Sequence, residues 1–249
     1  MDYYNQLKEI PFYKIHPSYL PFVGEDYDKY RILQVSESHY CMKIIDRQKY
    51  NIPYFKNWFT SECRDVEENM LGGNITRGVC ERVIRNAKDE ECRFPNFDNP
   101  LRSFCKIVLQ MENVKMSKYT DDRKNYSHFA FMNFYQVPAF KNMGCFKNSF
   151  YEEANKENID NADTILSLWR KESTVLLDQV IDILKPKAVA FTSMDAWEAY
   201  EQNDGKYKTS EIIIRAAHPN RPWYKKFAKL DGKTGKQAFE DGLLRIYGK

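Results

Sequence analysis

Four short polar stretches of the chain contain residue types that can do chemistry. Glu37 can orient or deprotonate a water molecule or stabilise a positive charge, and the imidazole of His218 can donate a hydrogen bond to a developing anion. Asn133 offers a donor and an acceptor in one plane, which suits the reading of a base edge. Each of these residues is by itself more often structural, so their common position in the fold carries the argument. The stretches are Ser36-Glu37-Ser38-His39-Tyr40, residues 133–139, Ser193-Met194-Asp195 and residues 218–224.

The polar stretches follow four segments that have the pattern of buried strands. A helix is predicted over residues 163–184, and Pro186 ends it just before the third of these strands. A helix that leads directly into a buried strand is typical of a parallel α/β sheet, in which ligands bind beyond the carboxyl ends of the strands. We therefore expect the polar stretches to meet at that edge, with a short helix over residues 193–200. The predicted strands, all short and rich in β-branched or aromatic residues, cover residues 31–35, 129–134, 188–192 and 211–217.

The expected fold class is α/β, a three-layer α/β/α sandwich with a central, mainly parallel four-stranded sheet, plus a helical insertion after the first strand. The insertion, residues 41–125, is predicted to contain helices over residues 76–88 and 101–114. Residues 1–30 carry three prolines among aromatic residues, and we expect them to form an irregular wrapping segment. Residues 1–249 are expected to be one domain.

Composition excludes several classes of protein. With 43% apolar and 29% charged residues among 249, the chain can bury a full core, which excludes wholesale disorder. It has no uninterrupted apolar run of the roughly 18 residues that a membrane span needs, and its first residues lack the pattern of an export signal. The six cysteines are scattered singly, so no metal site, iron–sulfur cluster or other cofactor is expected. We therefore expect a cytoplasmic protein with no membrane association.

Positive charge is concentrated near the C-terminus. The net charge is +3, but residues 205–249 hold eleven Lys or Arg against four Asp or Glu, a net +7 that leaves −4 for residues 1–204. Such asymmetry is typical of a surface that follows a phosphate backbone, although a solvated basic tail has the same composition.

The order of the motifs resembles that of the uracil-DNA glycosylase superfamily. Glu37 in Val35-Ser36-Glu37-Ser38-His39-Tyr40 matches the acidic motif after the family's first strand, and Phe131-Met132-Asn133 matches the strand that ends in a base-reading Asn. Ala196-Trp197 after the third strand and the stretch from His218-Pro219-Asn220 to Tyr224 match the later motifs. The resemblance covers about residues 20–40 and 125–225 and leaves the insertion unexplained.

This resemblance implies a monofunctional DNA glycosylase of DNA repair that hydrolyses the N-glycosidic bond of a flipped-out uracil or another damaged or modified base. Glu37 would stabilise the sugar cation and orient water, and His218 would stabilise the anionic base. The partner would be single- or double-stranded DNA, bound by a monomer without a cofactor or metal. The base would be bound by Asn133, Tyr40 and Phe134, with stacking by Tyr40 or by Tyr54, Phe55, Trp58 or Phe59. DNA would be held by Ser38, Asn220, Arg221, Trp223, Tyr224 and Lys225, with an aromatic wedge from residues 221–226.

Departures from the family pattern keep alternatives open. The first motif lacks Gly and Pro, the pair His39-Tyr40 replaces the family's Pro-Tyr, and Asn220 replaces a Ser, so the substrate base and the phosphate contact are open. Because the first motif can be slid by one residue, Ser36 competes with Glu37 for the catalytic position. A first alternative is an inactive nucleic-acid or nucleotide-binding module with the same fold. A second is another hydrolase that uses Ser36 or Ser38 with His39 or His218, although no Gly-x-Ser-x-Gly elbow is present.

Overall fold

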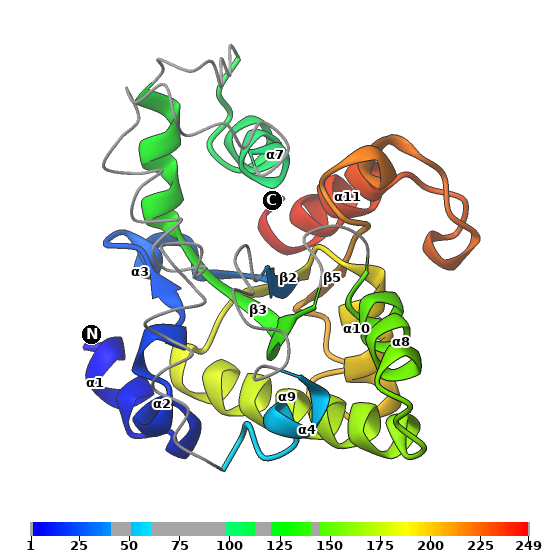
Figure 1. Cartoon of the computed structure of the whole chain (residues 1–249). Coiled ribbons are helices and arrows are strands. Elements are labelled where there is room, and N and C mark those ends of the chain that lie inside the picture. Colours follow the sequence, from blue (N-terminus) through cyan, green and yellow to red (C-terminus); the bar gives the residue numbers. More distant parts are fainter. Residues whose placement is uncertain (1, 41–50, 61–97, 113–120, 141–144, 249) are drawn as a thin grey trace.

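The fold is α/β, built on a five-stranded mixed sheet (Figure 1). The computed structural model describes residues 2–40, 51–60, 98–112, 121–140 and 145–248, with backbone alone at positions 39, 40, 121–123 and 221. The strand order is β1-β3-β2-β4-β5, and β1 pairs antiparallel with β3 whereas the other neighbours are parallel. The sheet thus has one more strand than the sequence indicated. The strands are β1 (Phe22–Val23), β2 (Ile32–Tyr40), β3 (Phe129–Ala139), β4 (Ala188–Phe191) and β5 (Ile213–Arg215).

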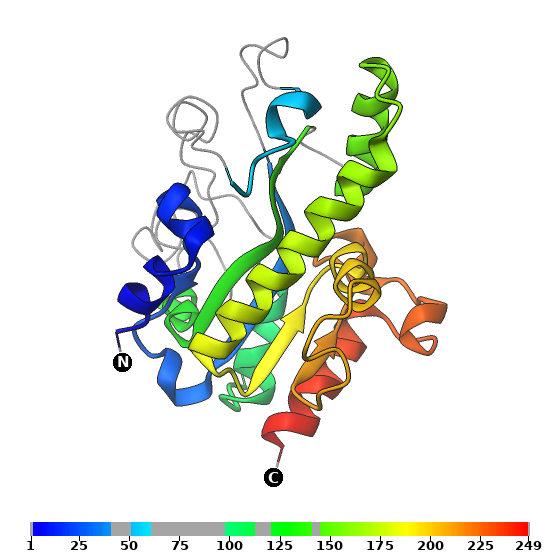
Figure 2. The same cartoon turned by 90° about the horizontal axis from the view of Figure 1, so that it is seen from below.

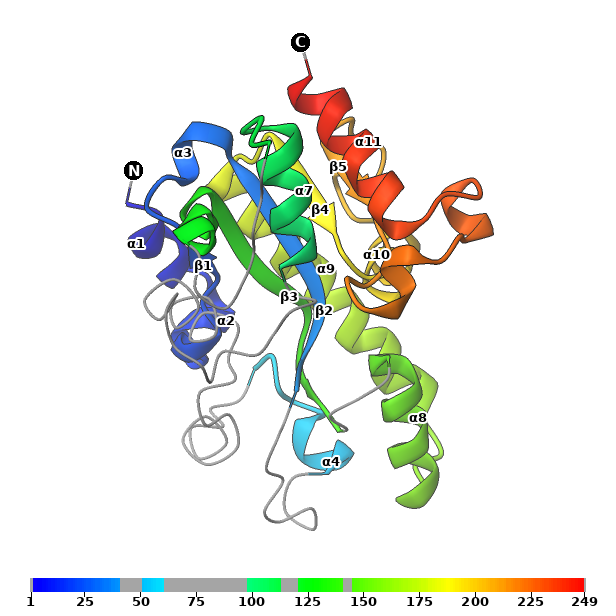
Figure 3. The same ribbon diagram turned by 90° about the horizontal axis from the view of Figure 1, so that it is seen from above.

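Two of the strands are longer than predicted. β2 continues to Tyr40 and β3 to Ala139, whereas their predicted ends were at residues 35 and 134. β4 stops at Phe191, opposite Val35, so β2 and β3 continue past it as a two-stranded ribbon (Figure 3). Polar residues ended the predicted strands, but cross-strand pairing sustains an extended backbone whatever the side chains are. β5 is shorter than its predicted segment.

Helix α9 (Ala162–Leu184) confirms the long helix predicted from apolar spacing. It ends at Lys185, which adopts a left-handed conformation with φ of 46°, and Pro186 follows. The next helix, α10 (Met194–Gln202), begins directly after β4 and confirms the short helix expected there. Ser193 is its N-cap, with a side chain that accepts a hydrogen bond from the backbone N–H of Ala196.

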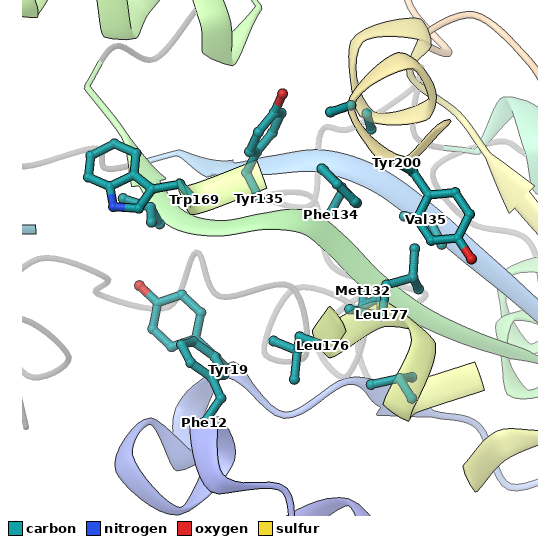
Figure 4. Close-up of a cluster of buried hydrophobic side chains, with 14 of the residues drawn as sticks. Phe12, Tyr19, Val35, Met132, Phe134, Tyr135, Trp169, Leu176, Leu177 and Tyr200 are labelled. Atoms are coloured by element: carbon teal, nitrogen blue, oxygen red, sulfur yellow. The ribbon is translucent and has the colours of Figure 1, made fainter. Parts of the chain in front are cut away.

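The two faces of the sheet are buried in two separate hydrophobic clusters. Strand alternation divides the side chains, so that Leu33 and Val35 lie in one cluster and Ile32 in the other. The first cluster includes residues of α8 (Phe146–Lys156), α9 and α10, and Figure 4 shows Leu176 and Leu177 of α9 close to Met132 of β3. The second cluster includes residues of α7 (Asn99–Ile107) and α11 (Gly235–Tyr247), a C-terminal helix that the sequence pattern did not indicate. Figure 2 shows α9 lying along the sheet.

The N-terminal region is helical rather than irregular. It forms α1 (Tyr3–Lys8), α2 (Pro11–Ile15), the 3₁₀ turn η1 (Pro17–Tyr19), β1 and α3 (Tyr27–Tyr30). Two of the three prolines that suggested irregular chain, Pro11 and Pro17, occupy the first turn of α2 and of η1, where the missing N–H costs nothing. The aromatic residues around them are buried in the cluster that contains α9.

Part of the predicted insertion is described. It contains α4 (Ile52–Phe55), α7 and the 3₁₀ segment η2 (Asp121–His128). α7 corresponds to the helix predicted over residues 101–114 but begins at Asn99 and ends at Ile107. The helix predicted over residues 76–88 lies outside the described residues. None of the helices in the described ranges is long and apolar enough to cross a bilayer.

Candidate functional site

The candidate site lies where β2 continues past the end of β4. β3, which follows β2 in the chain, lies on one side of β2, and β4, which follows β3, lies on the other side. This reversal is a topological switch point, and the crevice outside the carboxyl ends of such strands is where open α/β sheets bind ligands. The residue directly after β4, Thr192, still lies against β2 at this point, because its backbone N–H donates to the carbonyl of Val35 at 2.9 Å.

Glu37 is the ionisable group at this point. Its side chain is 7% exposed, and Oε2 accepts a 2.8 Å hydrogen bond from the hydroxyl of Ser193. Oε1 accepts a second hydrogen bond from the backbone N–H of Phe146, the first residue of α8. Burial raises the pKa of Glu37 to about 7, helped by the charge of Asp195 and opposed by the two hydrogen bonds. A carboxyl group with this pKa exchanges its proton near neutral pH, as an acid–base catalyst does.

A second carboxyl group and a thiol lie beside Glu37. Ligand atoms of Glu37, Cys145 and Asp195 all lie within 4.8 Å of one another. Burial raises the pKa of Asp195, whereas the guanidinium of Arg170, with a nitrogen 3.8 Å from Oδ1, and a hydrogen bond from Tyr135 lower it. The hydroxyl of Tyr135 also accepts a 3.2 Å hydrogen bond from Nε of Arg170. In the described part of the chain, the site therefore brings together the carboxyl groups of Glu37 and Asp195 and the guanidinium of Arg170, all largely withdrawn from water.

The carboxylate oxygens of Glu37 and Asp195 and the sulfur of Cys145 are of kinds that bind divalent cations. Both oxygens of Glu37, however, already accept hydrogen bonds from protein groups, and a guanidinium faces Asp195. A cation close to Arg170 would be repelled by it. We therefore treat the cluster as a set of interacting acids and not as a metal centre.

Ser36 and Glu37 leave the β2–β3 ribbon on opposite faces. The hydroxyl of Ser36 lies 3.1 Å from Oγ1 of Thr192, and in the β2–β3 register Ser36 pairs with Asn133. Side chains paired across parallel strands share a face, so Asn133 lies with Ser36 and away from Glu37. Glu37 instead faces α8 and α10 through Phe146 and Ser193. The structure thus separates two side chains that we expected in one pocket, and of Ser36 and Glu37 it is Glu37 that lies in the acid cluster.

His218 follows β5, at the same edge of the sheet. β4 lies between β5 and β2, which at the usual strand spacing puts the two strands about 10 Å apart. The imidazole is half-buried, and burial lowers its pKa, so it is neutral at neutral pH. A neutral imidazole at this edge has one N–H to donate toward a ligand.

Several aromatic residues proposed to bind the base belong to the core. Phe134, Phe55 and Trp58 are fully buried among other apolar side chains, which corrects the expectation that they stack on a ligand. Tyr54 and Phe59 are half-buried against the same cluster. The side chain of Tyr40 lies outside the described residues, and its backbone pairs with Ala139.

The residues proposed to hold DNA divide into buried and exposed groups. Trp223 is 1% exposed and packs 5.5 Å, ring to ring, from Phe239 of α11, so it is a core residue and not an accessible wedge. The adjacent Tyr224 is 63% exposed, and its hydroxyl donates to Oδ1 of Asn99 at 3.3 Å. Asn99 in turn donates to the carbonyl of Pro219 at 2.8 Å, which ties α7 to the loop after His218. Asn220 and Lys225 are exposed, Ser38 is buried, and the side chain of Arg221 lies outside the described residues.

Four participants in the acid cluster were given no individual role from the sequence. They are Tyr135, Cys145, the N–H of Phe146 and Arg170. Arg170 had a detectable signal, since it is a cation next to Trp169 in a helix whose core face is apolar. The other three come from segments whose packing depends on contacts distant in the chain.

No family model matches the chain, and neither a curated protein nor a solved structure matches it.

Proposed function

We propose that the protein is a DNA glycosylase, similar to the uracil-DNA glycosylase superfamily, that removes a flipped-out uracil or another damaged or modified base. The observation that supports this most directly is Glu37, a buried carboxyl group at the switch point with a pKa near 7. The two clusters on opposite faces of the sheet agree with the three-layer α/β/α arrangement that the resemblance implies, which we include in the proposal.

In the proposed reaction the bond between C1′ of the deoxyribose and the base nitrogen breaks. Its electron pair goes to the base, and the anion that forms is stabilised by the N–H of His218. Ionised Glu37 stabilises the cationic sugar and accepts a proton from the attacking water, whose oxygen bonds to C1′. The departing base takes up a proton, so the products are the free base and an abasic site.

DNA would lie over the basic C-terminal surface. Lys225, Lys226 and Lys229 are exposed in the segment that follows His218, and Tyr224 provides an accessible aromatic ring there. Cations on such a surface neutralise phosphates, and an inserted ring helps to extrude a nucleotide from the stack. The base-reading role expected for Asn133 is not part of this proposal, because Asn133 lies on the opposite face of the ribbon to Glu37. A monomeric state and a cytoplasmic location remain predictions.

Base release measured by mass spectrometry tests the proposal. The substrates are single- and double-stranded DNA that carry uracil, hypoxanthine or 5-substituted pyrimidines, and the variants are Glu37→Gln and His218→Ala. We expect free base from at least one substrate, with release reduced at least about a hundredfold by either variant. Asp182→Asn, an exposed carboxylate of α9 paired with Lys206, is the matched control and should leave release unchanged. Release that persists fully in Glu37→Gln would remove Glu37 from the mechanism.

The alternative is a nucleic-acid or nucleotide-binding module without glycosylase activity. One observation favours it, namely that Glu37 and Asn133 lie on opposite faces of the ribbon, where a single base cannot contact both by a direct approach to one face. This alternative predicts salt-dependent DNA binding by the folded protein without release of any base.

A further inference from the structure

We propose that Asp195 is a positioning residue for Glu37: the two carboxyl groups share one proton, and Arg170 holds the negative charge on Asp195 so that the proton stays on Glu37. This inference rests on the proposed glycosylase function and names what controls the charge of the catalytic carboxyl group. The pairing itself is a property of the folded protein without substrate.

The geometry of the pair requires that its two groups influence each other. Carboxylate oxygens of Glu37 and Asp195 lie within 4.8 Å of one another, on β2 and at the second residue of α10. Glu37 is buried, and Asp195 is only 17% exposed. Two negative charges so close, with little water between them, repel strongly, and such pairs hold one proton over a wide pH range.

The two carboxylate oxygens of Asp195 have different surroundings. Oδ1 lies 3.8 Å from a guanidinium nitrogen of Arg170, whereas Oδ2 is buried and has no hydrogen-bond partner within the described residues. A buried carboxylate oxygen without a partner is costly. A protonated neighbour supplies a donor to such an oxygen, and Glu37, with a carboxyl oxygen within 4.8 Å of the Asp195 carboxylate, can carry that proton.

The charges around the pair decide which member holds the proton. Arg170 of α9 and the hydroxyl of Tyr135 of β3 stabilise an ionised Asp195, and Lys147 of α8 adds to this effect. Among the described residues, the donors to Glu37 are both neutral, the hydroxyl of Ser193 and the N–H of Phe146. Since a cation favours the anion more than a neutral donor does, Asp195 ionises first.

The other ionisable groups that the structure describes near the pair do not reverse this order. Glu198, one turn further along α10, repels a negative charge on Asp195 and opposes its ionisation less strongly than Arg170 favours it. Cys145 contributes a thiol whose pKa is raised by burial, so it stays neutral at neutral pH. The net charge of Asp195, Arg170 and a protonated Glu37 is zero, and the site becomes negative when Glu37 ionises.

A titration of the Glu37 carboxyl group tests the inference without any substrate. Protein labelled with ¹³C at the δ-carbon of Glu is titrated by NMR from about pH 4 to about pH 9, and Glu37→Gln identifies the Glu37 signal. We expect a midpoint near neutral pH that falls by about one pH unit in Asp195→Asn, because the repulsion is removed. Asp178→Asn changes another half-buried carboxyl group, on α9, which accepts a hydrogen bond from Tyr200 of α10, and should leave the midpoint in place.

A second variant keeps the inference testable if Asp195→Asn does not fold. Arg170→Gln removes the cation and should raise the midpoint of the pair, because Asp195 then competes with Glu37 for the proton. An unchanged Glu37 midpoint in whichever variant folds would overturn the inference. If glycosylase activity is present, its acid limb should shift with the NMR midpoint. If no base is released but the midpoints shift, the pairing stands and the proposed function fails. If base is released but the midpoint does not shift, the proposed function stands and the pairing fails.

Discussion

Ser193 joins the candidate catalytic carboxyl group to the start of a helix. Its hydroxyl donates to Oε2 of Glu37 at 2.8 Å, and the same oxygen accepts from the backbone N–H of Ala196 at 3.3 Å. One side chain therefore both caps α10 and stabilises the ionised form of Glu37. The position of α10 on the sheet and the charge of Glu37 are coupled through this residue.

Replacement of Ser193 by Ala should have two separable effects. Loss of the cap should lower the free energy of unfolding by about 0.5–2 kcal/mol, measured by urea denaturation. Loss of the donor to Glu37 should raise the Glu37 midpoint in the ¹³C titration. Thr234→Ala is the matched control, since Thr234 caps α11 in a capping box and has no contact with Glu37. It should reproduce the loss of stability alone, and equal midpoints in the two variants would contradict the coupling.

Replacement of Glu37 by Gln should stabilise the protein at neutral and alkaline pH. The folded-state pKa of Glu37 is raised from 4.5 to about 7, so the folded protein retains a proton that the unfolded chain releases. Below about pH 4.5 Glu37 is protonated in both states and does not destabilise the fold. As pH rises through about 7 its ionisation lowers the free energy of unfolding, by about 3 kcal/mol in total. Urea denaturation should show a gain of that order in Glu37→Gln at pH 8 and a negligible one at pH 4. A loss of stability at pH 8 would show that the ionised form is the one that the fold prefers.

The rate of base release should rise with pH through about 7. The proposed mechanism needs ionised Glu37, which forms as pH passes the raised pKa. Burial lowers the pKa of His218 below its ordinary value, so the imidazole is neutral at and above neutral pH. Initial rates at saturating substrate should fall about tenfold per pH unit on the acid side. A rate independent of pH between 5 and 9 would exclude an ionised Glu37 from the rate-limiting step.

The adjacent residues Trp223 and Tyr224 should respond oppositely to replacement by Ala. Trp223 is buried against Phe239, so Trp223→Ala should destabilise the fold by about 3–5 kcal/mol. Tyr224 is exposed, so Tyr224→Ala should change stability little but weaken binding of single-stranded DNA by about five- to 150-fold if its ring stacks on a base. Tyr224→Phe loses only the hydrogen bond to Asn99 and should keep the affinity. Normal DNA affinity in Tyr224→Ala would exclude its ring from the interface.

The exposed lysines after His218 should contribute a salt-dependent part of DNA binding. Lys225→Gln combined with Lys226→Gln should reduce the slope of log affinity against log salt by about 0.9 for each phosphate contact that is lost with duplex DNA. Lys171→Gln combined with Lys185→Gln removes the same charge from α9 and its C-terminus, outside the basic segment, and is the control. Fluorescence anisotropy at several salt concentrations gives the slopes. Equal slopes in both double variants would place the DNA elsewhere.

Much of the fold can be predicted from local pattern. The apolar spacing of α9, the breaker Pro186 and the buried run of β4 act within a few residues, so their secondary structure was correctly identified. The extent of β2 and β3 could not be predicted, because the polar residues Ser36 to Ser38 remain in the strand through pairing with β3 and through contacts with residues far along the chain. The helices of residues 1–30 were missed because prolines mark both irregular chain and helix starts.

The sequence by itself determined that a carboxyl group, Glu37, lies near the carboxyl edge of a mainly parallel sheet, since local strand and helix patterns set that edge. Only the tertiary structure decided what surrounds it. The partners of Glu37 are Phe146 and Ser193, 109 and 156 residues further along the chain, and helix packing brings Asp195 and Arg170 beside them. The register of β2 on β3 also separated Glu37 from Asn133, because alternate residues of a strand face opposite sides of the sheet. Residue types thus identify possible chemistry, whereas burial and long-range contacts set the charge of each group and the groups that act together.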